Sequence, residues 1–170
     1  MRAFIGVGSN ILPKRNITVA LTRLCMHAGI TGISTFYRTR PISGENQDDY
    51  LNGVWQINTL ISPQELKHRV LKTIERDLHR IRTQDKHNPR TIDLDLLIFE
   101  DFVINEEGFR IPDPDIYKRS FIAFPLFELD PGLIMPDTKT PLANILKSLS
   151  KDNLKPDIPF TESLKSKIKL

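Results

Sequence analysis

Two aspartates, Asp93 and Asp95, lie two positions apart in a segment that is otherwise mainly apolar. The apolar residues alternate with them and predict a strand whose inward face holds Ile92, Leu94, Leu96 and Ile98. Side chains two residues apart on a strand point the same way, with Cα atoms about 6.6 Å apart. Two carboxylates so placed can bind Mg²⁺, which prefers carboxylate oxygens together with substrate phosphates, and a pair of such ions can clamp a transferred phosphoryl group. Aspartates that only face solvent on an edge strand would show the same pattern, so both interpretations stay open at this point.

Arginines near these aspartates favour chemistry on phosphates. Arg80, Arg82 and Arg90 flank the pair in sequence, and a guanidinium binds phosphate oxygens with planar, bidentate geometry. The sequence has no Walker-type glycine-rich loop and no set of kinase motifs, so side chains must hold any nucleotide. Its histidines lack a metal-binding spacing and no serine lies in a nucleophile elbow, which disfavours zinc chemistry and acyl transfer. For each arginine, a surface ion pair is the alternative interpretation.

Positive charge gathers around the same arginines. The chain has 170 residues, 39% hydrophobic and 26% charged, with a formal net charge of +3 at pH 7, which is typical of one globular domain. Between residues 67 and 90 there are eight Lys or Arg against three Asp or Glu. A polyanion is a partner that would suit this excess, although a solvated helix face would explain it too.

Strands and helices around one core are expected to carry these residues. Strands are predicted over residues 2–7, 30–39, 50–59 and 92–98, with a hairpin near 102–110. Helices are predicted over residues 14–28, 62 to about 82, 119–129 and 141–149. In residues 50–59, two-residue alternation puts Tyr50 and Asn52 on one face and Trp55 in the core. Segments 40–49 and 83–89 are predicted to be loops that can move.

The two ends of the chain bear on its domain organisation. Residues 150–170 are rich in lysine without clear periodicity, so we expect a loosely attached tail after a domain of residues 1–149. No apolar run of about 18 residues is present and the start does not form a signal peptide. A single cysteine, Cys25, excludes an internal disulfide framework. We therefore expect a cytoplasmic protein with no membrane partner.

Several longer motifs follow one another in a specific order and spacing. They are Gly8-Ser9-Asn10, Phe36-Tyr37-Arg38-Thr39, Q-D-D-Y-L-N at 47–52, Glu75, Arg80-Ile81-Arg82, P-R-T-I-D-L-D-L-L at 89–97, Arg119-Ser120-Phe121 and Pro125-Leu126. Together they resemble the 6-hydroxymethyl-7,8-dihydropterin pyrophosphokinase family over about residues 3–149. A lone D-x-D would be weak evidence, but this ordered set is specific.

The resemblance implies a fold, a reaction and a set of site residues. The fold is a ferredoxin-like α+β sandwich with a central antiparallel sheet and helices on both faces. The reaction is transfer of the β,γ-diphosphate of ATP to the pterin alcohol, with release of AMP, in folate synthesis. Two Mg²⁺ ions would bind Asp93 and Asp95, and Arg80 and Arg90 would be catalytic. The residues that match the pterin site are Thr39, Arg40, Pro41, Ile42, Tyr50, Asn52 and Phe121. The residues that match nucleotide or phosphate contacts are Lys72, Glu75, Arg82, Arg90 and Arg119.

Three positions depart from the pattern of the family. His87 stands where many members have an aromatic residue, Pro112-Asp113 stands where many have Pro-His, and Lys72 replaces a frequent glutamine. Asp113 near ATP phosphates would be repulsive unless it turns away, so the resemblance does not carry the phosphate contact of that histidine over to this chain. His87 can still stack on a ring, and Lys72 keeps a donor for phosphate.

These observations lead to an expected mechanism and two alternatives. We expect a monomer that binds small molecules and no nucleic acid, in which the pterin hydroxyl attacks the β-phosphorus in line while metals and arginines stabilise the charge. One alternative is a pterin-binding relative without activity because of Asp113. The other is a ferredoxin-like module that binds RNA, although the sheet aromatics expected of such a platform are missing. An assay of AMP release would separate all three.

Overall fold

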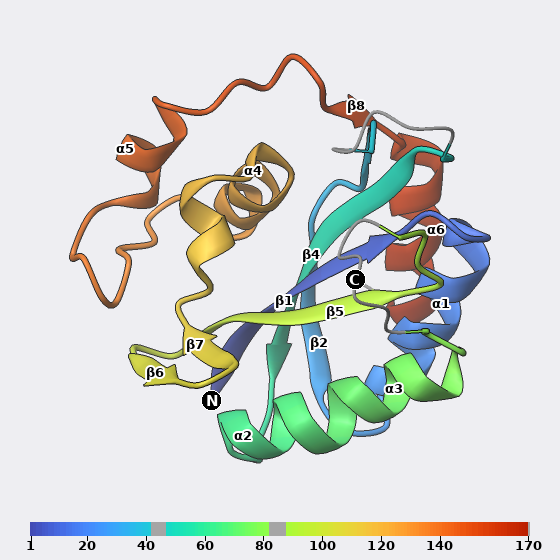
Figure 1. The fold of residues 1–170 in the computed structure, drawn as a ribbon, viewed down its shortest axis with the longest axis horizontal. Coiled ribbons are helices and arrows are strands. Elements are labelled where there is room, and N and C mark those ends of the chain that lie inside the picture. Colours follow the sequence, from blue (N-terminus) through green and yellow to red (C-terminus); the bar gives the residue numbers. More distant parts are fainter. Residues whose placement is uncertain (42–46, 82–87, 170) are drawn as a thin grey trace.

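The computed structural model describes residues 1–41, 47–81 and 88–169, and every structural statement below concerns these residues. Its centre is a six-stranded sheet in the order β5-β1-β4-β3-β8, with β2 also paired to β4 (Figure 1). The strands are β1 (Arg2–Ser9), β2 (Gly29–Ile33), β3 (Tyr37–Thr39), β4 (Tyr50–Asn58), β5 (Asp93–Phe99) and β8 (Lys155–Pro156). All of these pairings are antiparallel. A separate hairpin joins β6 (Ile104–Glu106) to β7 (Phe109–Ile111).

Helices cover both faces of the sheet (Figure 1). On one face lie α1 (Pro13–Leu24), α3 (Lys72–Asp77) and α6 (Ile158–Ile168), and on the other lie α4 (Ser120–Leu129) and α5 (Leu142–Leu146). In β1, Ile5 belongs to the first hydrophobic cluster and Phe4 to the second, as the alternation of a strand requires. The predicted ferredoxin-like α+β sandwich is confirmed, and Trp55 is fully buried as predicted. No described helix combines the length and the apolar character needed to cross a membrane.

Strand β5 alternates as predicted only as far as Leu96. Its register with β1 then shifts by one residue, so that Leu97 and Ile98 both join the hydrophobic cluster beneath α4 while Leu96 stays in the other cluster. Such a β-bulge places an extra residue in one strand of a pair. The prediction that Ile98 shares the face of Leu96 is therefore wrong. Asp93 and Asp95 precede the bulge and keep a common face.

The helical segment that begins after Ser62 ends earlier than predicted. It passes through α2 (Pro63–Glu65), the π-helical segment η1 (Leu66–Leu71) and α3. Its end is a Schellman motif, because His79 adopts a left-handed φ of 58° and the Arg80 N–H donates to the Glu75 carbonyl at 3.0 Å. The prediction that the helix continues to about Arg82 is wrong. Arg80 leaves the helix here, and the next residue, Ile81, is 79% exposed instead of continuing the apolar stripe.

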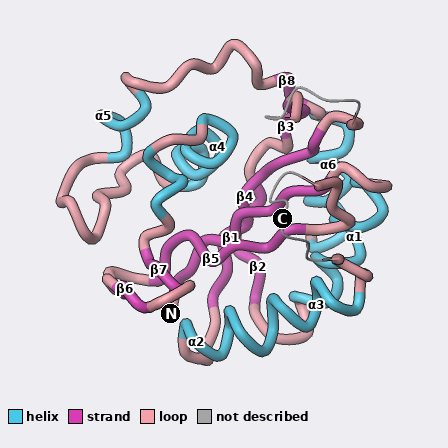
Figure 2. Tube along the Cα trace, in the orientation of Figure 1, coloured by secondary structure: helices cyan, strands magenta, loops and turns pink. Residues whose placement is uncertain are grey.

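The end of the chain packs on the core, so the prediction of a loosely attached tail is wrong for the described part of it. A long connection after α5 brings β8 beside β3 (Figure 2). Helix α6 then buries Phe160 and Leu164 in the hydrophobic cluster that also contains α1 residues. Asp157 accepts the Phe160 N–H at 3.2 Å and pairs with Lys14 at 3.1 Å and Arg38 at 2.8 Å. The apolar spacing of four residues was hidden among the lysines of this segment.

Candidate active site

An open cavity of about 410 Å³ lies on the α4 side of the sheet. Its lining residues are Gly6, Val7, Gly8, Thr39, Arg40, Pro41, Tyr50, Asn52, Gly53, Arg90, Asp93, Asp95, Leu97, Asp115, Arg119, Phe121 and Ile122. They come from β1, β4, β5, the end of β3 and the residues after it, the segment before β5, the 3-10 turn η2 (Pro114–Tyr117), and α4 with the residue before it. The cavity therefore brings most of the predicted pterin residues and both predicted metal ligands into one volume. Ile42, Arg82 and His87 lie outside the described residues.

Gly8, on strand β1 between β4 and β5, lines this cavity. It lies opposite Asn52 on β4 and opposite Asp93 on β5. Asn52 is 6% exposed and its Nδ2 donates to the Thr39 hydroxyl at 2.7 Å. A Cβ atom on Gly8 would come within 2.7 Å of the Asn52 Oδ1, which no real Cβ contact tolerates without a shift. Glycine at this position therefore lets Asn52 keep its place across β1 from Asp93.

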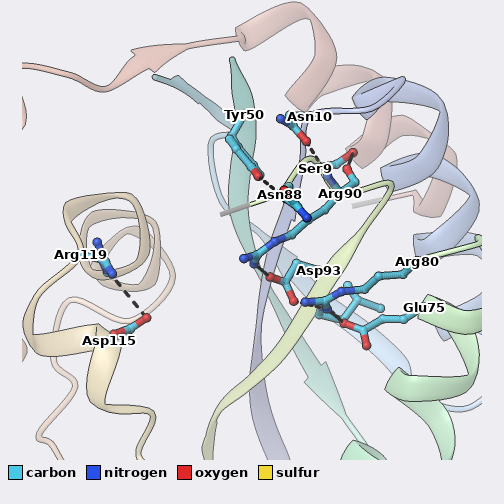
Figure 3. A network of polar contacts seen from close by, with 11 residues as sticks. Ser9, Asn10, Tyr50, Glu75, Arg80, Asn88, Arg90, Asp93, Asp115 and Arg119 are labelled. Carbon is cyan, nitrogen blue, oxygen red and sulfur yellow. Dashed lines mark hydrogen bonds and ion pairs between the residues drawn. The ribbon is translucent and has the colours of Figure 1, made fainter. Parts of the chain in front are cut away.

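Asp93 is the centre of a charged network (Figure 3). One of its carboxylate oxygens accepts a hydrogen bond from Arg80, and the other accepts one from Arg90. The same Arg80 nitrogen donates to Glu75, whose Oε1 also accepts the Leu94 N–H at 3.0 Å. The side chains of Arg80 and Asp93 are each only 13% exposed. These arginines are therefore held within a partly buried network and are not loose surface ion pairs.

Asp95 differs from Asp93 in its surroundings. Its carboxylate forms no hydrogen bond or ion pair that involves another described residue. Desolvation and, after it, the negative charges of Asp93, Asp113 and Glu75 raise the pKa of Asp95 above its ordinary value. Because the side chain is accessible to water from the cavity, we attribute the raised pKa chiefly to repulsion from these carboxylates. A cation bound here would relieve that repulsion.

The motif Gly8-Ser9-Asn10 also holds the segment that carries Arg90 (Figure 3). The Ser9 hydroxyl donates to the Thr91 carbonyl at 2.6 Å, and the Arg90 N–H donates to Asn10 Oδ1 at 2.7 Å. Asn10 is 4% exposed, and its Nδ2 reaches the Asp48 carbonyl at 3.3 Å. One buried amide thus connects the segment before β5 to the segment before β4. The sequence motif gave no hint of this role, because the partners are distant in the chain.

Two residues predicted to contact nucleotide lie outside the cavity lining. Glu75 is 3% exposed and bonds to Arg80 and to the backbone of β5. Lys72 lies exposed on α3. Arg80 also does not line the cavity and reaches it only through Asp93. A direct ligand contact for these three residues stays a prediction.

Asp113, the main departure from the family pattern, turns toward its own backbone. Its Oδ1 accepts the Asp115 N–H at 2.8 Å and so caps η2. Burial raises the pKa of Asp113, and its charge in turn contributes to the raised pKa of Asp95. Asp115, which belongs to none of the sequence motifs, lines the cavity, and its Oδ2 lies 3.8 Å from the Arg119 Nε (Figure 3).

The donor set at Asp93 and Asp95 fits one type of metal site. Within the described ranges, no group of three or more His, Cys, Asp or Glu side chains is placed to hold a metal ion. Mg²⁺ is typically held by one or two carboxylates, with waters and substrate phosphates completing its shell. Two adjacent aspartates facing an open cavity match that requirement, whereas a structural zinc site with four protein ligands does not.

Comparison with known proteins gives consistent matches. Residues 4–131 match the family model described as 7,8-dihydro-6-hydroxymethylpterin-pyrophosphokinase. The chain is 35% identical over 140 residues to the 2-amino-4-hydroxy-6-hydroxymethyldihydropteridine pyrophosphokinase of Aquifex aeolicus, covering 82% of this chain and 86% of that protein. The protein of the same name from Haemophilus influenzae is 33% identical over 140 residues, 81% of this chain and 86% of that one. Folic acid synthesis protein fol1 of Schizosaccharomyces pombe is 37% identical over 156 residues, which are 90% of this chain and 21% of the longer protein.

Proposed function

This chain belongs to the 7,8-dihydro-6-hydroxymethylpterin-pyrophosphokinase family, and we propose that the cavity on the α4 side of the sheet is its active site. The enzyme transfers pyrophosphate from ATP to hydroxymethyldihydropterin, a step in folate synthesis. One observation supports the location above the others. A stacking ring, a buried amide and two carboxylates, from Tyr50, Asn52, Asp93 and Asp95, line the same 410 Å³ cavity.

We assign the pterin end of the cavity to Tyr50, Asn52 and Phe121. Two aromatic rings can stack on the flat bicycle of the pterin, and the amide of Asn52 can read its polar edge. Thr39 keeps this amide in place through the 2.7 Å hydrogen bond. Arg40 and Pro41 complete this end of the lining.

We assign the phosphate end to Asp93, Asp95, Arg90 and Arg119. Two Mg²⁺ ions, held by the two aspartates and by substrate phosphates, would supply charge neutralisation and orient the reacting oxygens. The pterin hydroxyl oxygen forms a bond to the β-phosphorus and loses its proton to water. The bond from that phosphorus to the oxygen bridging to the α-phosphate breaks, and AMP leaves. Arg90 and Arg119 stabilise the charge on the transferred group.

We also propose that the enzyme works as a cytoplasmic monomer on small molecules alone. Residues of one chain supply polar groups for both the pterin end and the phosphate end of the proposed site, which supports this proposal. Size-exclusion chromatography with light scattering tests whether the enzyme is a monomer. A rate of AMP release that RNA leaves unchanged would support action on small molecules alone.

An assay of AMP release with hydroxymethyldihydropterin, ATP and Mg²⁺ tests the function. Asp95→Asn should keep the fold and lose nearly all turnover, by at least about a hundredfold, because a neutral amide is a poor Mg²⁺ ligand. Asp101→Asn, which changes an exposed aspartate in the turn after β5, is the matched control and should turn over normally. Pterin binding without any AMP release in the wild type would instead support the inactive-relative alternative, and salt-dependent RNA binding that does not need Asp93 would support the RNA module.

A further inference from the structure

Both carboxylate oxygens of Asp93 are occupied by arginine side chains. Arg80 binds one oxygen and Arg90 binds the other. A cation that approaches Asp93 therefore meets the positive charge of two guanidinium groups already bonded to its oxygens, and it competes with them for the same carboxylate. Asp95, two residues along the same strand, forms no such bond with a described residue. The two proposed metal ligands thus differ in how readily a cation can reach them.

Other residues hold both arginines in place beside Asp93. Glu75, only 3% exposed, bonds to Arg80 and to the backbone of β5, which fixes Arg80 beside the strand. On the other side, Asn10 holds the backbone of Arg90 through a 2.7 Å hydrogen bond. A side chain as long as arginine loses conformational entropy when it forms an ion pair. Anchoring of Arg80 and Arg90 lowers this entropic cost of pairing with Asp93.

We propose that Arg80 and Arg90 are exchangeable counter-ions of Asp93 that compete with a divalent cation, and that triphosphate oxygens release them. This inference rests on the proposed metal site. A guanidinium and a divalent cation on one carboxylate repel each other, so the cation alone binds weakly. Phosphate oxygens offer the arginines an alternative partner with the same bidentate geometry. Metal and nucleotide then favour each other's binding through an exchange of partners, and the coupling is reciprocal.

We expect one variant, Arg90→Ala, to change its affinities for two ligands in opposite directions. Arg90→Ala should bind Mn²⁺ alone about three- to tenfold more tightly than the wild type, because a competitor for Asp93 is gone. The same variant should bind the preformed complex of Mn²⁺ with α,β-methylene-ATP about tenfold or more weakly, because a phosphate partner is gone. Titrations followed by the paramagnetic resonance of free Mn²⁺ and by calorimetry measure both affinities without turnover. Shifts in the same direction for both ligands, or no shift for Mn²⁺ alone, overturn the proposal.

Arg119→Ala is the matched control. It removes the same charge from the same cavity, but Arg119 lies near Asp115 and not near Asp93. Its affinity for Mn²⁺ alone should change less than about twofold, because salt screens charges that are not in contact. An equal gain in Arg119→Ala would show a general effect of net charge and contradict the competition. If Arg90→Ala does not fold by circular dichroism, Arg90→Gln, which is uncharged but keeps a donor, takes its place.

A further variant separates this inference from the proposed function. Asp95→Asn should abolish detectable binding of Mn²⁺ alone if the metal assignment is right. Unchanged Mn²⁺ binding in Asp95→Asn overturns the assignment of the metal site and the competition with it. Lost binding in Asp95→Asn together with normal Mn²⁺ affinity in Arg90→Ala overturns only the competition.

Discussion

Gly8 shows how a single missing side chain shapes the proposed site. Asn52 and Asp93 flank it on the neighbouring strands, and the space that a Cβ atom would fill is taken by the Asn52 Oδ1. An added methyl group must therefore move the amide or the central strand. Because Thr39 also holds that amide, the displacement would reach the β3 side of the cavity.

We expect Gly8→Ala to weaken pterin binding by about tenfold while ATP binding changes much less, because a misplaced polar group costs on the order of 1 kcal/mol or more. Gly29→Ala, also on a strand, is the control, since its Cβ would meet nothing nearer than the Asn58 carbonyl at 3.9 Å. Calorimetric titration of both variants with each ligand checks this. Normal pterin affinity in a folded Gly8→Ala protein would place the pterin elsewhere.

Tyr50 offers a second test of the pterin end. Its ring lines the cavity and its hydroxyl donates to the Asn88 carbonyl at 3.2 Å. Tyr50→Ala should raise the pterin Kd by about fivefold or more and leave the ATP Kd almost unchanged, because a stacking face is worth about 1 kcal/mol. Tyr50→Phe keeps the ring and should bind pterin nearly as the wild type does. Equal losses for both ligands in Tyr50→Ala would show that the ring does not belong to the pterin site.

Among the elements, the C-terminal segment supports β3, the strand that leads into the proposed pterin site. Strand β8 pairs with β3, and Asp157 pairs with Arg38 on that strand. Thr39, Arg40 and Pro41 of the cavity lining follow directly. The matched family model ends at residue 131, so this support lies beyond the part of the chain that the model matches.

We expect Asp157→Asn to lower the free energy of unfolding by about 1–2 kcal/mol, because the variant keeps a helix cap for α6 but loses its charge toward Lys14 and Arg38. Both cationic side chains are about half exposed, which keeps the expected loss below that of a fully buried pair. Urea unfolding measures it. Asp152→Asn, an exposed change in the preceding turn, should stay within about 0.5 kcal/mol of the wild type.

The effect of Asp157 should also depend on pH. Burial alone would raise the pKa of this carboxyl, but hydrogen bonds from Lys14, the Phe160 amide and Arg38 outweigh it and lower the pKa below its ordinary value. The folded state therefore binds fewer protons in acid than the unfolded state, and the stabilisation is present above about pH 4 and lost as pH falls through the folded pKa. The difference in unfolding free energy between wild type and Asp157→Asn should shrink from pH 7 to pH 3. A constant difference would contradict the ionic origin.

The elements also show which features the sequence could predict. Most strand and helix positions followed from apolar periodicity, but the single strand predicted over residues 30–39 is wrong, since β2 and β3 divide that segment. The two aspartates share a face because alternation holds up to Leu96. The end of α3 was missed, since a left-handed His79 carries no signal of the kind that glycine gives. The packed α6 was missed because Phe160 and Leu164 lie among lysines. In the cavity, Asp115 and Leu97 were missed, because only tertiary contacts and a bulge bring them there.

At the scale of the whole molecule, the order of the strands decides when the site can form. Strand β1 lies between β5 and β4 and is the first to be made, yet its Val7 pairs with Gly53 on one side and Leu94 on the other. Closing such long loops precedes any gain from the contacts, which slows folding. During synthesis on the ribosome, the cavity cannot exist until β5 and α4 have emerged, so no ligand can assist the early steps. Substrates should consequently slow the unfolding rate while leaving the refolding rate unchanged. Stopped-flow refolding and unfolding with and without α,β-methylene-ATP and pterin would measure this, and faster refolding with ligand would indicate an earlier, partial site.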